Sequence, residues 1–304
     1  MSQPADAQRD FMFTFRADGD GEAAPGVFTY MTVLRVYGQA GRALMVLTRH
    51  NGDLLGRPVG LFSEALTAER TKEVATAVEG VKWAELPKPI GGDISGSMLS
   101  IDYTHGPRII QRKFNSWNTE FVRAIAPVMG QVDQLGSALL AKPQRAVDVT
   151  VTRTPAGFKL VIRNVGVGAV MIADPRQPAG APAAAGATRG TVTLAAEPEQ
   201  KPGWTAMPPA WRPVPLEPLG NASPTVMILP GKTHEVDTVP WTPPGPGKYM
   251  AQGIWKDYAG PDVDPKTVMP LLPDPKQLDD KHPYVVRGAA FSSYVKFEVD
   301  KPRR

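Results

Sequence analysis

Hydrophobic and polar residues alternate along most of this chain, which is the spacing of half-buried β-strands. Phe11, Phe13 and Phe15 begin the pattern and predict a strand over 11–16. Further β-prone runs follow over 27–37, 43–48, 98–103 and 108–114. A Gly-rich segment separates the first two runs and His105-Gly106 separates the last two, so two β-hairpins are expected.

Two segments have the three- and four-residue spacing of an amphipathic helix instead. Thr67 can cap the first helix, whose apolar face includes Val74 and Val78. The second helix begins near Asn118, with apolar residues at Phe121, Ile125, Val128, Val132, Leu135 and Leu139. Pro127 should kink this helix, because proline removes one backbone donor.

Proline usage divides the chain into two predicted domains. Residues 1–142 contain 7 prolines and residues 143–304 contain 25, and the helical spacing stops at the same point. The order strands, helix, hairpin, helix predicts an α+β domain over 1–142, with an antiparallel sheet and two helices. About eight short alternating runs predict an all-β sandwich over 146–301. Two proline-rich insertions, near 197–224 and 259–283, are expected to interrupt it.

The segment 230–255 is expected to form the central hairpin of this sandwich. Pro230-Gly231 is a turn, an extended run ends at Trp241, and a second turn lies at Gly247. Tyr249, Ala251, Gly253 and Trp255 then occupy alternate positions. The succession Pro-Gly-Lys, Trp, Pro-Gly-Lys-Tyr and Gly-x-Trp resembles bacterial immunoglobulin-like β-sandwich modules, including those of the intracellular proteinase-inhibitor type. The resemblance covers the C-terminal domain only, implies an Ig-like fold and assigns no functional residues.

Charge and composition exclude several classes of function. Residues 1–142 have no net charge, and Lys301, Arg303 and Arg304 at the tail account for much of the excess of +4 in residues 143–304. No basic face remains for nucleic acid. The chain has no cysteine, which excludes disulfides and thiolate metal sites. No apolar run approaches the ~20 residues of a membrane span. We expect a cytoplasmic protein if Met1 is the native start, and an envelope or secreted protein if a signal peptide was removed.

Local motifs predict no catalytic residue, metal site or cofactor. The histidines His50, His105, His234 and His282 are too far apart in sequence for an HxH or HExxH pattern, and they are expected to be solvated turn residues. No G-x-S-x-G elbow is present. The acidic run at 18–22 has its glycines in the wrong register for a calcium loop, so a turn is expected there.

The candidate binding residues lie in or directly beside the two insertions of the second domain: Trp204, Trp211, Tyr258, Asp262 and Asp264. Long loops on a rigid scaffold often carry function. Two interpretations of the tryptophans stay open. Their proline-rich surroundings could form a polyproline-II surface for a partner, or the rings could fold back over an edge of the sandwich.

Three functional hypotheses follow. The first is a non-catalytic binding or assembly protein whose sandwich loops contact another protein. The second is a hydrolase-type enzyme with a site at the domain boundary, built from Asp102, His105 and the long loops. The third is a proteinase inhibitor, which the sandwich resemblance implies and which predicts a projecting rigid loop.

Overall fold

A computed structural model shows a largely β protein with few helices and several sheets. The strand pairs described are antiparallel except for one parallel pair. It describes residues 11–19, 30–37, 42–47, 56–86, 98–115, 118–178, 188–197, 210–257 and 283–300. The chain divides into two compact units. Unit 1 comprises Met1–Arg49, Gly60–Gln144 and Asp264–Leu278, and unit 2 comprises His50–Val59, Arg145–Val263 and Asp279–Arg304.

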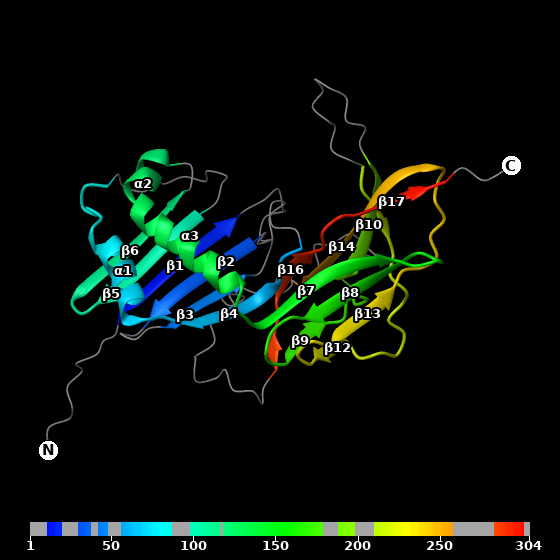
Figure 1. The fold of residues 1–304 in the computed structure, drawn as a ribbon, viewed down its shortest axis with the longest axis horizontal. Coiled ribbons are helices and arrows are strands. Elements are labelled where there is room, and N and C mark those ends of the chain that lie inside the picture. Colours follow the sequence, from blue (N-terminus) through cyan, green and yellow to red (C-terminus); the bar gives the residue numbers. More distant parts are fainter. Residues whose placement is uncertain are drawn as a thin grey trace, which may run out of the picture. The chain divides into compact units, whose positions relative to one another are not determined.

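Unit 1 contains an antiparallel sheet in the order β4-β3-β2-β1-β5-β6 (Figure 1). The strands are β1 (Met12–Gly19), β2 (Tyr30–Tyr37), β3 (Arg42–Leu47), β4 (Val59–Ala65), β5 (Met98–His105) and β6 (Arg108–Asn115). Phe11, Phe13 and Phe15 are all buried, and both predicted hairpins are confirmed. The sequence pattern did not predict β4, and the turn expected at 18–22 is wrong for Asp18 and Gly19, which continue β1 opposite β2.

The helices of unit 1 are α1 (Ala68–Glu79), α2 (Thr119–Ala124) and α3 (Ala126–Leu140). The Thr67 hydroxyl accepts the Arg70 backbone N–H at 3.2 Å, as the capping prediction requires. The second predicted helix is present but broken at Ile125, with Pro127 in the first turn of α3, where a missing N–H costs nothing. Its apolar residues Val128, Val132, Leu135 and Leu139 are buried. α1 and α3 pack against each other and lie across the sheet (Figure 1).

Unit 2 is built from short strands. They are β7 (Pro143–Arg153), β8 (Phe158–Asn164), β9 (Val170–Ala173), β10 (Gly190–Ala196), β11 (Arg212–Val214), β12 (Thr225–Ile228), β13 (Thr233–Asp237), β14 (Gly247–Asp257), β15 (Tyr284–Val285), β16 (Gly288–Phe291) and β17 (Val295–Val299). β13, β8 and β7 pair in that order. A second sheet has the order β11-β10-β14-β16, with β17 also paired to β14. The third is β12-β9-β15, in which β9 and β15 are parallel.

The first two of these sheets pack face to face. Alternate residues of β7 and β8 share one core with β10 and β14. Gly253 of β14 lies so close to β8 and β7 that a Cβ there would approach the Leu160 side chain to 2.7 Å and Val151 Cβ to 3.4 Å. Trp255 is fully buried in this core, as its alternation with Ala251 predicts.

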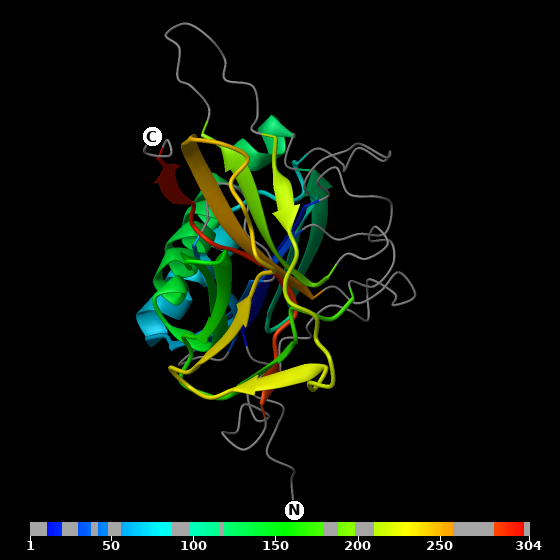
Figure 2. The ribbon, with the colours of Figure 1, turned by 90° about the vertical axis from the view of Figure 1, so that its right-hand side faces the viewer.

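The central hairpin predicted over 230–255 is wrong. β13 pairs with β8, whereas β14 pairs with β10, β16 and β17, so the two strands lie in different sheets. Their connection can be followed in Figure 2, in yellow and orange. Pro240, Pro243, Pro244 and Pro246 lie in it and lack the N–H groups that a ladder needs. Alternation fixes which side chains point inward, but either a hairpin or a crossing between sheets satisfies it.

Candidate functional site

Trp211 is the one predicted binding residue that the structure describes. Trp204, Tyr258, Asp262 and Asp264 lie outside the described residues. Trp211 is partly buried, and its ring stacks on Tyr294 with a centroid separation of 5.5 Å and an interplanar angle of 19°. Tyr294 keeps 44% of its surface exposed. Offset stacking of this kind adds about 0.5–1.5 kcal/mol beyond the area that it buries.

The Trp211–Tyr294 pair spans the outer face of the second sheet of unit 2. Trp211 directly precedes β11 and Tyr294 directly precedes β17, with β10 and β14 between those strands. Paired positions share a face, so Ala195 and Met250 lie on the same side as Trp211. Both are at least 93% buried although they point away from the core. This placement supports the interpretation that Trp211 folds back over the sheet, while Tyr294 leaves an accessible aromatic surface.

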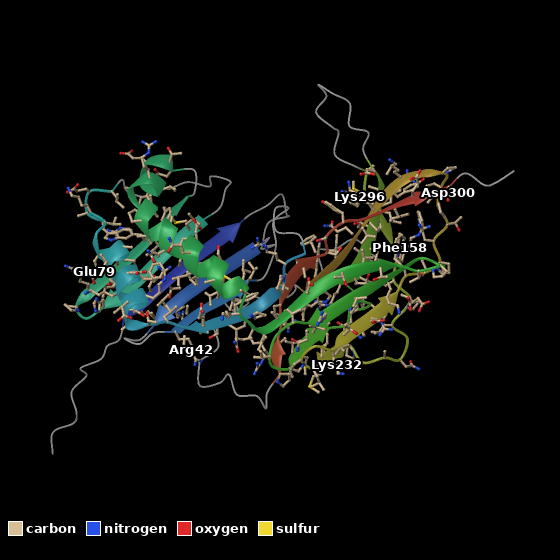
Figure 3. The ribbon with its side chains drawn as sticks, viewed as in Figure 1. Arg42, Glu79, Phe158, Lys232, Lys296 and Asp300 are labelled. Carbon is tan, nitrogen blue, oxygen red and sulfur yellow. The ribbon has the colours of Figure 1, made fainter. Side chains whose placement is uncertain are left out.

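An ion pair lies on the same face. Lys296 of β17, labelled in Figure 3, contacts Glu197 with 2.5 Å between Nζ and Oε1. Lys296 pairs in register with Met250 and lies two residues beyond Tyr294, so it projects on the same side. The Lys296 ammonium holds the pKa of Glu197 below its usual range. The surface therefore combines a stacked aromatic pair with a solvated charge pair.

A buried carboxylate joins the end of β9 to β13. Asp174 is fully buried and accepts hydrogen bonds from the Arg176 backbone, from Arg176 Nε and Nη2, and from His234 Nε2 at 3.1 Å. Burial raises the pKa of Asp174, but the hydrogen bonds and positive charges of Arg176, with His234, outweigh it and hold the pKa below its usual range. Burial lowers the pKa of His234, with Asp174 opposing the shift. The prediction of a solvated turn histidine is wrong for His234, which lies in a strand.

A second buried carboxylate, that of Asp257, lies at the end of β14. Asp257 is 1% exposed and pairs with Arg189 through one oxygen and with Arg287 through the other, the latter at 2.7 Å. Arg189 immediately precedes β10, Asp257 ends β14 and Arg287 precedes β16. One carboxylate thus ties together three strand ends that are far apart in sequence.

Unit 1 contains an acid–base cluster around Glu79, the last residue of α1 (Figure 3). Its Oε1 accepts the Tyr103 hydroxyl at 2.5 Å and lies 2.8 Å from His105 Nδ1, and Oε2 accepts Arg108 Nη1 at 2.8 Å. The hydrogen bonds from Tyr103 and His105 lower the pKa of Glu79. Burial, and then Glu79, raise the pKa of Tyr103.

The structure does not bring Asp102 into this cluster. Asp102 lies between Tyr103 and Ile101 on β5, so its side chain projects from the opposite face of the strand to those of Tyr103 and His105. His50 and His282 lie outside the described residues. In the described part of the chain, no group of three or more His, Cys, Asp or Glu could hold a metal ion. None of the helices described there is long and apolar enough to cross a membrane.

Comparison with known proteins does not assign the chain. No protein-family model matches the sequence, and no curated protein matches it either. The Ig-like resemblance therefore stays a prediction.

Sequence analysis missed the polar clusters and Tyr294. A polar residue at the end of an apolar run, such as Asp174 directly after β9 or Asp257 at the end of β14, is a weak local signal of a buried ion pair. The contact of Tyr294 with Trp211 joins residues 83 positions apart, for which no sequence pattern exists.

Proposed function

We propose that this chain is a non-catalytic binding or assembly protein, and that unit 2 contacts another protein at the Trp211–Tyr294 surface. The observation that supports this most is the stacked pair itself, which presents an accessible aromatic surface on a rigid sheet. Tyrosine and tryptophan are enriched among the residues that contribute most to protein–protein binding. Residues 1–142 have no net charge and much of the excess of +4 in residues 143–304 lies at the tail, which favours a protein partner over nucleic acid.

We also propose an Ig-like architecture for unit 2. Two packed sheets, with consecutive strands β13 and β14 on opposite sheets, are in keeping with that class. Loops at the ends of such a scaffold can change without disturbing the core. This arrangement suits a recognition module.

A pull-down from native host lysate tests the binding proposal. The intact protein is compared with Trp211→Ala/Tyr294→Ala, and Ile109→Ala serves as the matched control because Ile109 is an exposed apolar residue of unit 1. A recovered partner is then purified and its affinity measured directly. We expect the double variant to bind at least tenfold more weakly and the control to bind normally. Equal affinity of all three proteins would overturn the Trp211–Tyr294 assignment.

A hydrolase is the second candidate, and the Glu79–His105 contact favours it. A carboxylate that accepts His Nδ1–H orients the ring and directs the Nε2 lone pair outward, as a general base requires. Hydrolysis of p-nitrophenyl esters by the intact protein, by Glu79→Gln and by His105→Gln tests this. Equal rates in all three proteins exclude a catalytic role for the pair.

The proteinase-inhibitor hypothesis concerns the two proline-rich insertions. Most of their residues lie outside the described part of the chain, so the projecting loop stays a prediction. Inhibition assays against a panel of serine, cysteine and metallo-proteinases address it directly.

A further inference from the structure

The three-stranded sheet β12-β9-β15 has an apolar outer face. Met227, Met171 and Val285 are paired in register across its three strands. Met227 is 57% exposed and Val285 is 42% exposed. Ile228 and Val170, which are the next pair along the ladder and point to the opposite face, are each at most 2% exposed. All three strands, with sequences TVMI, VMIA and YV, lack charged residues. Edge strands usually carry charges that prevent association with other chains, and this sheet has none.

The backbone of β12 also has an open edge. The Asp174 N–H donates to the Pro224 carbonyl oxygen at 3.0 Å, which fixes the phase of the β9–β12 ladder. In an antiparallel ladder, alternate residues bond to the same neighbour, so Val226 and Ile228 face β9. The N–H and C=O of Met227 therefore point away from β9. Within the described ranges, β12 pairs with no other strand.

The exposed area decides which occupant suits this surface. Met227, Leu229 and Val285 are between 42% and 57% exposed. Together they expose roughly 300 Å², the size of the largest apolar patch on many monomers. A stable dimer between folded copies buries about 800 Å² on each partner. Side-chain contact alone is therefore too small for a second copy, whereas an added strand gains main-chain hydrogen bonds as well.

We propose that the open edge of β12 binds an extended peptide segment of a partner protein, which adds a strand beside β12. Alternate apolar side chains of that segment, separated by uncharged polar ones, would pack beside Met227 and extend the row of Met227, Met171 and Val285 by one strand. The proposal is independent of the Trp211–Tyr294 surface, which lies on a different sheet of unit 2. The edge of β12 would thus be a second interaction surface, and the partner segment would bind it as an extended strand.

Fluorescence anisotropy with a panel of labelled nonapeptides tests the proposal on the full chain. Each peptide alternates Val, Ile or Leu with Thr and has a Lys at both ends for solubility. For the tightest peptide, single N-methyl groups are placed on successive residues. N-methyl groups on the peptide edge that faces β12 should weaken binding about tenfold, because each removes a hydrogen-bond donor and adds a clash. N-methyl groups on the opposite edge of the peptide should leave the affinity unchanged.

Two protein variants complete the test. Met227→Lys keeps the backbone but places a charge on the edge, so it should weaken binding about tenfold or more. Ile109→Lys changes an exposed residue of unit 1, which is 69% exposed, and should have no effect. The absence of saturable binding across the panel, or equal effects of both N-methyl phases, would overturn the proposal. Concentration-dependent dimerisation in sedimentation that Met227→Lys abolishes would also overturn it, and would assign the edge to a second copy.

Discussion

The indole N–H of Trp255 donates to the carbonyl oxygen of Ala173, 3.1 Å away. Trp255 lies on β14 and Ala173 ends β9, so this hydrogen bond links two different sheets of unit 2. Ala173 immediately precedes Asp174, whose carboxylate holds Arg176 and His234. Trp255 and the ion cluster of Asp174 therefore hold two consecutive residues of the same chain segment.

Replacing Trp255 with Phe should lower the free energy of unfolding by about 3 kcal/mol, because the change leaves a cavity and an unpaired buried carbonyl. Trp211→Phe is the control, since Trp211 is only partly buried and a Phe ring can still stack on Tyr294. Urea denaturation at equilibrium measures both variants. Equal stability of the two would contradict the role assigned to the Trp255 hydrogen bond and its packing.

Gly253→Ala should destabilise unit 2 by about 1–3 kcal/mol, because the new methyl group would overlap the Leu160 side chain between the packed sheets. Gly245→Ala provides the match, since no atom lies within 4 Å of a Cβ built there. Thermal unfolding followed by circular dichroism compares the two. A Gly253→Ala protein as stable as Gly245→Ala would mean that the two sheets are not in close contact at this point.

His234 should make stability depend on pH between neutral and mildly acidic conditions. Burial lowers the pKa of His234 in the folded chain below the ordinary value of about 6.5. At a pH between the folded and the unfolded pKa of His234, the unfolded chain binds more protons than the folded chain. The free energy of unfolding should therefore fall as the pH falls below about 6.5. His234→Gln removes this dependence but also loses the hydrogen bond to Asp174. We therefore expect the stability difference between the two proteins to be largest at pH 7.5 and to narrow toward pH 5. Urea titrations at several pH values measure it, and a constant difference would refute the assignment.

Glu79→Gln should lower the stability of unit 1 by about 1 kcal/mol, because Tyr103, His105 and Arg108 lose the charge that they share. Glu73→Gln is the matched control on the same helix, since Glu73 is 56% exposed and forms an ion pair with Arg70, three residues earlier. Amide hydrogen exchange at the end of α1 gives a local measure of the effect. Faster exchange in Glu79→Gln than in Glu73→Gln is expected, and equal rates would show that the cluster does not anchor the helix.

The sequence by itself determined most of the segments that become helices and strands in the described part of the chain, but β4, β11, β15 and β16 were not predicted. β11 lies inside the insertion that was expected near 197–224. Thr67, Asn118 and Pro127 act through neighbours three or four residues away, so their effects are visible in a local pattern. The burial of Phe13 and Trp255 likewise follows from alternation. β4 was missed although it is buried, and Trp211 was recognised only as a candidate with two open interpretations.

Only the tertiary structure decided how those strands pair and which polar side chains meet. Val236 and Trp255 point into one core whether their strands form a hairpin or lie in opposite sheets, so alternation could not distinguish the two. The contacts of Asp174 with His234 and of Trp211 with Tyr294 join residues 60 and 83 positions apart. Hydrogen bonds and ring stacking act over a few ångströms in space, and the fold alone brings such distant residues together.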